Sequence, residues 1–184
     1  MNVIGLDPGF ASLGWGVVEL TPRVVLINAG CIRTKKSQRK VLATDDNVRR
    51  IRELYRVLDP VFTQYEPRAI ATESMSWPRS SSVCAKLGMS WGLSIAIAER
   101  YDLPLVSVSP MDLKTALTGD GTASKAEVRA AVLATPGFHR LAGLLDKAKF
   151  PPSQYEHPTD AVAAVLATQT TDIMRTIRQL GGTR

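Results

Sequence analysis

Two acidic residues stand where apolar runs of strand-like composition stop. Asp7 closes "VIGLD" and Glu73 closes "RAIATE". The backbone is rigid at a strand end, so a carboxylate there has a fixed position. Nearly all crossover connections between parallel strands are right-handed, and such a connection lets these two strands be neighbours with their ends on one edge of a sheet. The pattern therefore indicates two carboxylates that share one site.

A second pair of polar residues stands at the start of the last predicted helix. Asp160 follows His157 by three residues, a spacing that lets both side chains face the same way on one helical turn. Three carboxylates and an imidazole on one rim suit one or two hard divalent cations. Carboxylates favour Mg²⁺ or Mn²⁺, and Mn²⁺ tolerates the imidazole more readily. We predict a metal site made of Asp7, Glu73, His157 and Asp160.

Each of these residues also has an ordinary structural interpretation. Asp7 lies in "DPG", and this tripeptide is good turn chemistry. Asp160 can favour a helix N-terminus, an arrangement that contributes about 0.3 to 1 kcal/mol. A lone histidine such as His157 is more often a surface or capping residue than a ligand. Only the whole set favours a metal site.

The elements that must position these residues form an alternating pattern. Three consecutive strands joined by short turns, a helix that bends near Pro60, and a buried strand are expected at 2–7, 14–20, 24–33, 44–67 and 68–74. A second helix, a fifth strand and two short helices follow at 81–100, 103–109, 112–117 and 124–134. A basic loop at 146–158 leads to one long final helix at 159–180, with Pro158 in its first turn. The order predicts an α/β fold with a mixed sheet and helices on its faces.

Composition is typical of one globular domain of 184 residues, because 45% of residues are hydrophobic and 22% are charged. This balance argues against disordered, collagenous and membrane classes. The net charge of +6 makes a polyanionic partner plausible.

Cys31 and Cys84 match no metal-ligand spacing and indicate reduced thiols. We find no basic leader and no uninterrupted apolar run near the roughly 18 to 20 residues that span a bilayer, so we expect a cytoplasmic protein.

Six segments, taken in order along nearly the whole chain, resemble the RuvC-type Holliday-junction resolvases. They are "VIGLDPGFASLGWGVVE", "GCIRT", "IATES", "AKLGMSWG", "MDLKTALTGDGTASKAEV" and "HPTDAVAAVLA". The resemblance implies a ribonuclease-H-like fold, with three antiparallel strands followed by two parallel ones. It also implies a homodimer that resolves four-way junctions in DNA recombination and repair, by Mg²⁺-dependent hydrolysis that leaves 5′-phosphates.

The resemblance also assigns roles to individual residues. The family's metal ligands and catalytic positions fall on Asp7, Glu73, His157 and Asp160, with two ions per site and Mn²⁺ able to substitute. Many members have aspartate where this chain has His157. Lys114 and Lys125 fall where the family has lysines near the scissile phosphate, although a solvated helix face would also explain them. Further candidates for DNA contact are Arg79, Lys147, Lys149 and the segment "TKKSQRK" at 34–40.

One aromatic residue and two glycines complete the expected set. The family carries an aromatic or apolar residue that wedges into the junction after the strand-end glutamate. Here Ser76 holds that place and Trp77 follows it, with loop packing as the alternative role. Gly88 and Gly92 are one turn apart in a helix, where each costs roughly 1 kcal/mol against alanine, so a close backbone approach is expected. The resemblance makes the approaching element the partner's helix, and packing on the chain's own sheet is the alternative.

Other functions remain open from the sequence. Actin-like sugar kinases and chaperone ATPases also begin with a strand-ending aspartate and a glycine turn, but they need two such lobes. A nuclease of broader specificity would act on flaps, forks or RNA–DNA hybrids. A non-catalytic module would bind junctions without cutting them. Nothing in the sequence specifies a branch-migration helicase partner.

Overall fold

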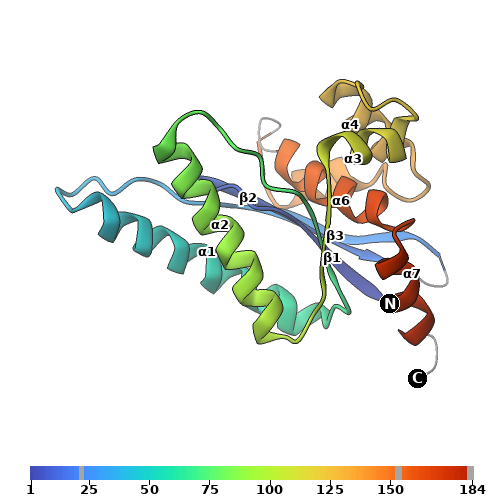
Figure 1. The fold of residues 1–184 in the computed structure, drawn as a ribbon, viewed down its shortest axis with the longest axis horizontal. Coiled ribbons are helices and arrows are strands. Elements are labelled where there is room, and N and C mark those ends of the chain that lie inside the picture. Colours follow the sequence, from blue (N-terminus) through green and yellow to red (C-terminus); the bar gives the residue numbers. More distant parts are fainter. Residues whose placement is uncertain (21–22, 152–154, 182–184) are drawn as a thin grey trace.

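A five-stranded mixed sheet runs through the computed structural model, which describes residues 1–20, 23–151 and 155–181 (Figure 1). β1 (Asn2–Asp7), β2 (Ser12–Glu19) and β3 (Val25–Arg33) form an antiparallel meander. β4 (Ile70–Glu73) and β5 (Leu105–Val108) run parallel to β1, and the order across the sheet is β3-β2-β1-β4-β5. The predicted fold class is therefore confirmed, with three antiparallel strands followed by two parallel ones.

Helices cover both faces of this sheet (Figure 1). One face packs against α1 (Ala43–Tyr65) and α2 (Ser81–Arg100). The other carries α3 (Pro110–Thr118), α4 (Lys125–Ala134), α5 (Leu141–Lys147), α6 (Glu156–Thr168) and α7 (Asp172–Gly181). The sheet is thus a layer between two groups of helices.

β1 is apolar on both faces because it lies in the middle of this sandwich. Its side chains alternate between the two faces. Ile4 and Leu6 pack toward α1 and α2, whereas Val3 packs toward α6. Gly5 and Asp7 share the face of Val3 by the same alternation, so the strand-end carboxylate points to the side of the sheet that α6 covers.

Glycines let α6 lie directly on the sheet. A Cβ on Gly5 would overlap the carbonyl oxygen of Ala161, and a Cβ on Gly14 would overlap the backbone of His157. Gly16 meets the side chain of Val162 in the same way. Because Gly5 pairs with Gly16 across β1 and β2, these positions form one shallow patch under the helix. The sequence analysis gave these glycines no such role.

One helix prediction is wrong, and one helix was not predicted. The single final helix expected at 159–180 is two helices. The Thr171 amide donates to the Thr168 carbonyl at 3.0 Å, and the Thr171 hydroxyl then accepts from the Met174 amide at 3.3 Å. This hydroxyl caps α7 and separates it from α6. No helix was predicted before 159 in that region, yet α5 forms because Leu141 and Leu145, one turn apart, are both buried.

The remaining elements follow the predicted order with small shifts at their ends. Pro158 lies in the first turn of α6, as expected. Pro60 lies inside α1, which continues to Tyr65. Part of the loop expected at 146–158, namely 152–154, falls outside the described residues.

α2 is apolar enough to need separate comment. Its 20 residues include an 18-residue window that is apolar enough, by length and composition alone, for a membrane span, although no uninterrupted apolar run is present. Only 28% of that window is buried. Leu93, Ile97 and Ala98 pack into the core beneath the helix, so one side of α2 belongs to the globular fold. The outer side remains exposed.

Candidate active site

Asp7 and Glu73 lie side by side at the carboxyl ends of β1 and β4. The parallel register pairs Leu6 with Thr72, so the next residue of each strand is one of the two acids. Ligands commonly bind outside the carboxyl ends of strands in open α/β sheets. The sequence-based expectation that these two carboxylates share one edge therefore agrees with the observed register.

α6 brings the other two predicted ligands to the same edge. His157 lies over Gly14, which leaves no room for a side chain between strand and helix. Its Nδ1 lies 2.7 Å from Oδ2 of Asp7, so the two side chains are hydrogen bonded. Asp160 lies one helical turn further along α6 and retains 28% exposure of its side chain. The close contact between α6 and the sheet thus sets the position of both residues.

All four residues line one cavity of about 280 Å³. Lys114 from α3 and Lys125 from α4 line it as well, and its apolar wall includes Leu87 and Trp91 of α2. The structure therefore gathers six of the predicted functional residues. The carboxylates, the imidazole and the two ammonium groups that line this cavity suit a phosphate group and its counterions.

Burial and the charge of a neighbouring carboxylate raise the pKa of two carboxyls, Glu73 and Asp160. Burial first, and then the negative charge of Asp7, raise the pKa of Asp160 to about 6. The same two causes raise the pKa of Glu73, and Lys125 and Lys114 oppose the rise. The hydrogen bond to Asp7 raises the pKa of His157. A site that disfavours its own negative charges is one that a bound cation would stabilise.

A glutamate that the sequence analysis did not single out contacts one of the lysines. Lys125 forms an ion pair with Glu156 and lies 3.8 Å from Oδ2 of Asp160. The hydrogen bond to Glu156 raises the pKa of Lys125. A capping box between Ser124 and Glu127 fixes the start of α4 beside this lysine. Glu156 directly precedes the predicted ligand His157 in the chain. This adjacency was the only feature of the sequence that could have indicated a role for Glu156 at the site.

The donor set fits a hard divalent cation in its chemistry, since it offers three carboxylates and one imidazole. Within residues 1–20, 23–151 and 155–181, however, no three His, Cys, Asp or Glu side chains converge as ligands of one ion. The His157–Asp7 hydrogen bond pairs two of the predicted ligands with each other. A cation bound between these groups would replace that bond.

The loop after β4 leads from the cavity to the surface. Ser74 and Ser76 line the cavity, but Trp77 does not and has 77% of its surface exposed. Loop packing, the alternative role for this tryptophan, is not supported by that exposure. Arg79, two residues on, is also exposed. Neither residue lines the cavity, although both follow its lining residues Ser74 and Ser76 in the same loop.

The remaining predicted residues lie away from the cavity. Lys147 ends α5 and Lys149 follows it, and both are exposed. Gly88 and Gly92 lie on α2, where an added Cβ would meet nothing within 4 Å. The alternative that these glycines pack on the chain's own sheet is therefore wrong. Met89 and Ile95, exposed at 40% and 53%, extend the same uncovered side of α2.

Comparison with known proteins supports the relationship that the site suggests. The sequence model of the family described as "Crossover junction endodeoxyribonuclease RuvC" matches residues 3–149. This range holds Asp7, Glu73, Lys114 and Lys125 and ends before His157. The RuvC of Methylococcus capsulatus is 32% identical over 128 residues, which are 70% of this chain and 73% of that protein. The RuvC of a Synechococcus strain is 34% identical over 134 residues, or 72% and 82% of the two chains.

Solved structures show the same likeness over more of the chain. T. thermophilus RuvC in complex with a Holliday junction substrate superposes with a TM-score of 0.71 and 27% identity, covering 96% of this chain and 97% of the other. The yeast mitochondrial Holliday junction resolvase Ydc2 has a TM-score of 0.57 at 11% identity over 97% and 85% of the two chains, a likeness of fold alone.

Proposed function

Because this chain belongs to the RuvC family of crossover junction endodeoxyribonucleases, we propose that it resolves four-way DNA junctions with Asp7, Glu73, His157 and Asp160 as its metal-binding residues. It is an endonuclease that acts on branched DNA in recombination and repair. The observation that carries the assignment of residues is the meeting of two strand ends and one helix at a single cavity. We infer that it acts in the cytoplasm, where its DNA substrate would be.

The carboxylates and His157 would hold the divalent cations that the reaction needs. We propose two Mg²⁺ ions per site, with Mn²⁺ able to substitute. Such ions activate water and stabilise charge on the attacked phosphate and on the leaving 3′ oxygen, giving a 5′-phosphate and a 3′-hydroxyl. Asp7 is central in this set, since it lies next to Glu73 in the sheet and bonds His157.

The two lysines would act on the phosphate rather than on a metal. Lys114 and Lys125 line the cavity, so their ammonium groups can stabilise negative charge that develops on the phosphate oxygens. Glu156 holds Lys125 at the rim beside Asp160. This ion pair orients the lysine while DNA is absent.

A homodimer fits the exposed side of α2. Gly88 and Gly92 leave open space on the surface of this helix, and exposed apolar side chains of α2 lie around that space. A two-fold pair of such helices would bury this surface and present two active sites to the two strands that must be nicked. The same contact would explain why an apolar helix is so little buried in one chain.

Contacts outside the cavity would position the junction. We propose that Trp77 stacks against bases at the junction centre, because it is the exposed aromatic residue beside the cavity. Arg79, Lys147 and Lys149 are exposed cations that would bind backbone phosphates, which position DNA without reading its sequence. DNA binding should accordingly weaken steeply with added salt.

Cleavage of defined substrates tests this function. Purified protein is incubated with a four-way junction, a flap, a fork, a linear duplex and an RNA–DNA hybrid, each with Mg²⁺, with Mn²⁺ or with EDTA. We expect paired, symmetric nicks in the four-way junction that require a metal ion. Preferred cutting of flaps or forks would favour a nuclease of broader specificity. Junction binding without metal-dependent cutting of any branched substrate would contradict the proposal and indicate a non-catalytic module.

A further inference from the structure

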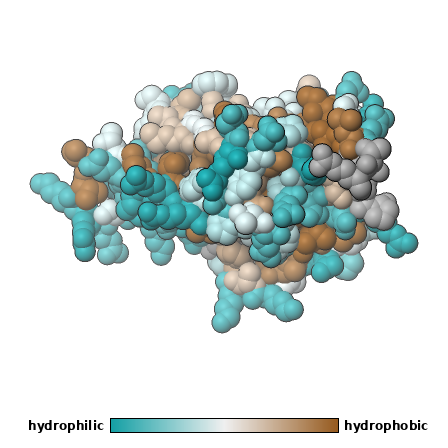
Figure 2. All heavy atoms as spheres, turned by 90° about the horizontal axis from the view of Figure 1, so that it is seen from below, coloured by the Kyte–Doolittle hydropathy of each residue, from teal (hydrophilic) through white to brown (hydrophobic). Residues whose placement is uncertain are grey.

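A second cavity, of about 300 Å³, lies between α2 and the connection from β3 to α1. We call it the basic pocket, because four of its lining residues are cations and one is an anion. The cations are Lys36, Arg39, Arg50 and Lys86, and the anion is Asp46. It shares no lining residue with the cavity of the catalytic residues. Figure 2, seen from below, shows hydrophilic side chains projecting at the end of the molecule that carries this connection.

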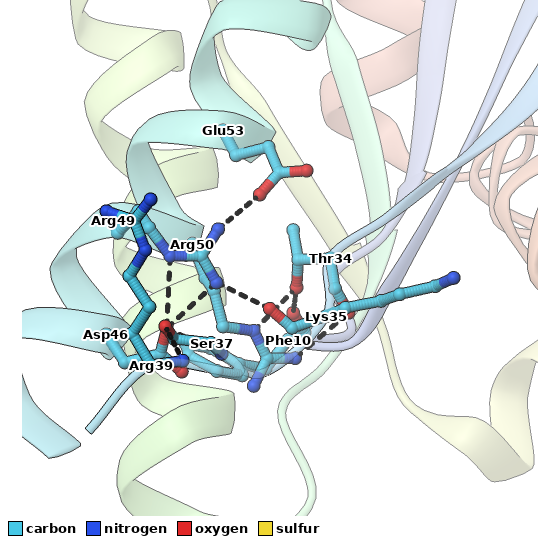
Figure 3. Close-up of polar contacts among 9 residues, drawn as sticks. All are labelled: Phe10, Thr34, Lys35, Ser37, Arg39, Asp46, Arg49, Arg50 and Glu53. Atoms are coloured by element: carbon cyan, nitrogen blue, oxygen red, sulfur yellow. Dashed lines mark hydrogen bonds and ion pairs between the residues drawn. The ribbon is translucent and has the colours of Figure 1, made fainter. Parts of the chain in front are cut away.

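Arg50 is the fixed cation of the basic pocket (Figure 3). The residue is only 8% exposed. Its Nε donates to the hydroxyl of Thr34 at 2.8 Å, and Nη2 donates to the Thr34 carbonyl at 3.3 Å. The guanidinium also stacks on Phe10, with its central carbon 4.3 Å from the ring centre. In the described part of the chain Nη1 has no acceptor, so a buried arginine keeps donor capacity on a pocket wall.

Asp46 does not cancel the positive charge of the basic pocket, because Arg49 already neutralises it. The Nε and Nη2 atoms of Arg49 lie 3.0 Å and 2.8 Å from Oδ1 of Asp46. The amide of Ser37 donates to the same oxygen at 3.1 Å, which ties the connection to α1. The hydrogen bond from Arg49 lowers the pKa of Asp46. Asp46 therefore shapes the pocket as a structural carboxylate.

The other three cations of the basic pocket are not neutralised by a carboxylate in the described part of the chain. Within residues 1–20, 23–151 and 155–181, Lys36, Arg39 and Lys86 take part in no ion pair. Lys36 and Arg39 are exposed, and Lys86 is half-buried. Several cations around a small cavity repel one another, and this repulsion is relieved when an oxyanion binds among them. The charge of the site therefore calls for a phosphate-like ligand.

α2 separates the basic pocket from the catalytic cavity. Ser82 and Lys86, one turn apart, line the basic pocket. Leu87 and Trp91, also one turn apart, line the catalytic cavity. A DNA backbone that leaves the catalytic cavity over the first turns of α2 thus reaches a second cationic site on the same protomer.

We propose that the basic pocket binds a backbone phosphate of the DNA substrate at a distance from the scissile bond, through Arg39, Lys86, Lys36 and the fixed guanidinium of Arg50. This inference rests on the proposed function for its ligand, since DNA is the polyanion that this enzyme family handles. It adds a phosphate site built from α1, α2 and the β3–α1 connection, none of which contributes a predicted metal ligand.

Fluorescence anisotropy with a labelled four-way junction and an equal-length duplex tests the proposal in EDTA, so that no DNA is cut. Arg39→Ala and Lys86→Ala each remove one pocket cation without touching a buried contact. Arg52→Ala and Arg56→Ala are the matched controls, because each removes one positive charge from an exposed residue of α1 that does not line the pocket. Affinity is measured over a range of salt concentrations.

We expect each pocket variant to bind both DNAs more weakly than either control and to lower the slope of log affinity against log salt by about 1, the value for one lost phosphate contact. Pocket variants that match the controls in affinity and slope would overturn the proposal. Titration with inorganic phosphate alone distinguishes a free-ion site. Phosphate binding that Lys86→Ala abolishes, with DNA binding unchanged, would likewise overturn it. Failure of the wild-type protein to cut junctions would contradict the proposed function alone, since the pocket is tested by binding.

Discussion

Nδ1 of His157 and Oδ2 of Asp7 lie 2.7 Å apart although 150 positions separate the residues in the chain. The contact joins the end of β1 to the start of α6 across Gly14. It also pairs the one imidazole of the site with its central carboxylate. Without a cation, therefore, the proposed ligands partly satisfy one another.

Replacing the imidazole by a carboxylate should change the metal preference. His157→Asp removes the hydrogen bond to Asp7 and makes the donor set all oxygen, which Mg²⁺ favours over mixed sets. We expect the ratio of kcat/KM with Mg²⁺ to that with Mn²⁺ to rise in this variant. Junction cleavage at saturating concentrations of each ion measures it. His139→Asp makes the same change at an exposed position and should leave the ratio at the wild-type value. An unchanged ratio in His157→Asp would mean that His157 is no ligand.

The depth of α6 on the sheet can be tested at Gly14. A Cβ there overlaps the backbone of His157, so Gly14→Ala must push the start of α6 away from β2. We expect a loss of about 1 to 3 kcal/mol in the free energy of unfolding, the usual cost of overpacking, together with a fall in junction cleavage. Urea unfolding and cleavage rates provide the two readouts.

Gly143→Ala is the control for that experiment. Gly143 lies in α5, and an added Cβ meets nothing within 4 Å. Alanine is favoured over glycine in a helix by up to about 1 kcal/mol, so this variant should be as stable as wild type or more so. Equal destabilisation by the two substitutions would contradict a special close approach at Gly14.

How far the sequence predicts this site depends on the kind of contact involved. Asp7 and Glu73 could be placed together because strand ends and crossover handedness follow local rules. The close approach of α6 to the sheet could not be predicted. Gly5, Gly14 and Gly16 make room for the helix only in the observed strand register, and the sequence does not define that register. The boundary after Thr168 was missed for a local reason, since apolar periodicity continues through it while the Thr171 hydroxyl caps a new helix. The Lys125–Glu156 ion pair joins α4 to α6. The relative position of these two helices is set by tertiary packing, which no local sequence pattern predicts.

The exposed side of α2 predicts a specific effect on assembly. Gly92→Arg places a long charged side chain on a helix surface that touches nothing in its own chain. The fold should therefore persist, while a dimer formed through this surface should dissociate. Sedimentation equilibrium measures the dissociation constant, and circular dichroism measures helix content. Gly143→Arg, another helical glycine with open space around it, should leave the dimer intact. Retention of the wild-type dimer in Gly92→Arg would exclude this side of α2 as the interface.

The raised pKa of Asp160 predicts how stability changes with pH in the absence of metal. The folded protein holds a proton on this carboxyl up to about pH 6, whereas the usual value is 3.8. The folded state therefore binds more protons than the unfolded state between these values, and stability falls as the pH rises through that window. Asp160→Asn has no carboxyl that titrates at this position, so this decrease in stability is absent from the variant. In EDTA, its free energy of unfolding relative to wild type should increase from pH 4 to pH 7. A pH-independent difference would contradict the assigned cause.

Cleavage and binding of one four-way junction by wild-type and Asp7→Asn protein test the proposed active site most directly. The substitution keeps the size of the side chain and removes the charge that the cations would need. We predict that Asp7→Asn abolishes Mg²⁺-dependent cutting and binds the junction in EDTA as tightly as wild type. Cutting at the wild-type rate would contradict the role of Asp7 as a metal ligand, and loss of binding together with cutting would show that Asp7 is structural.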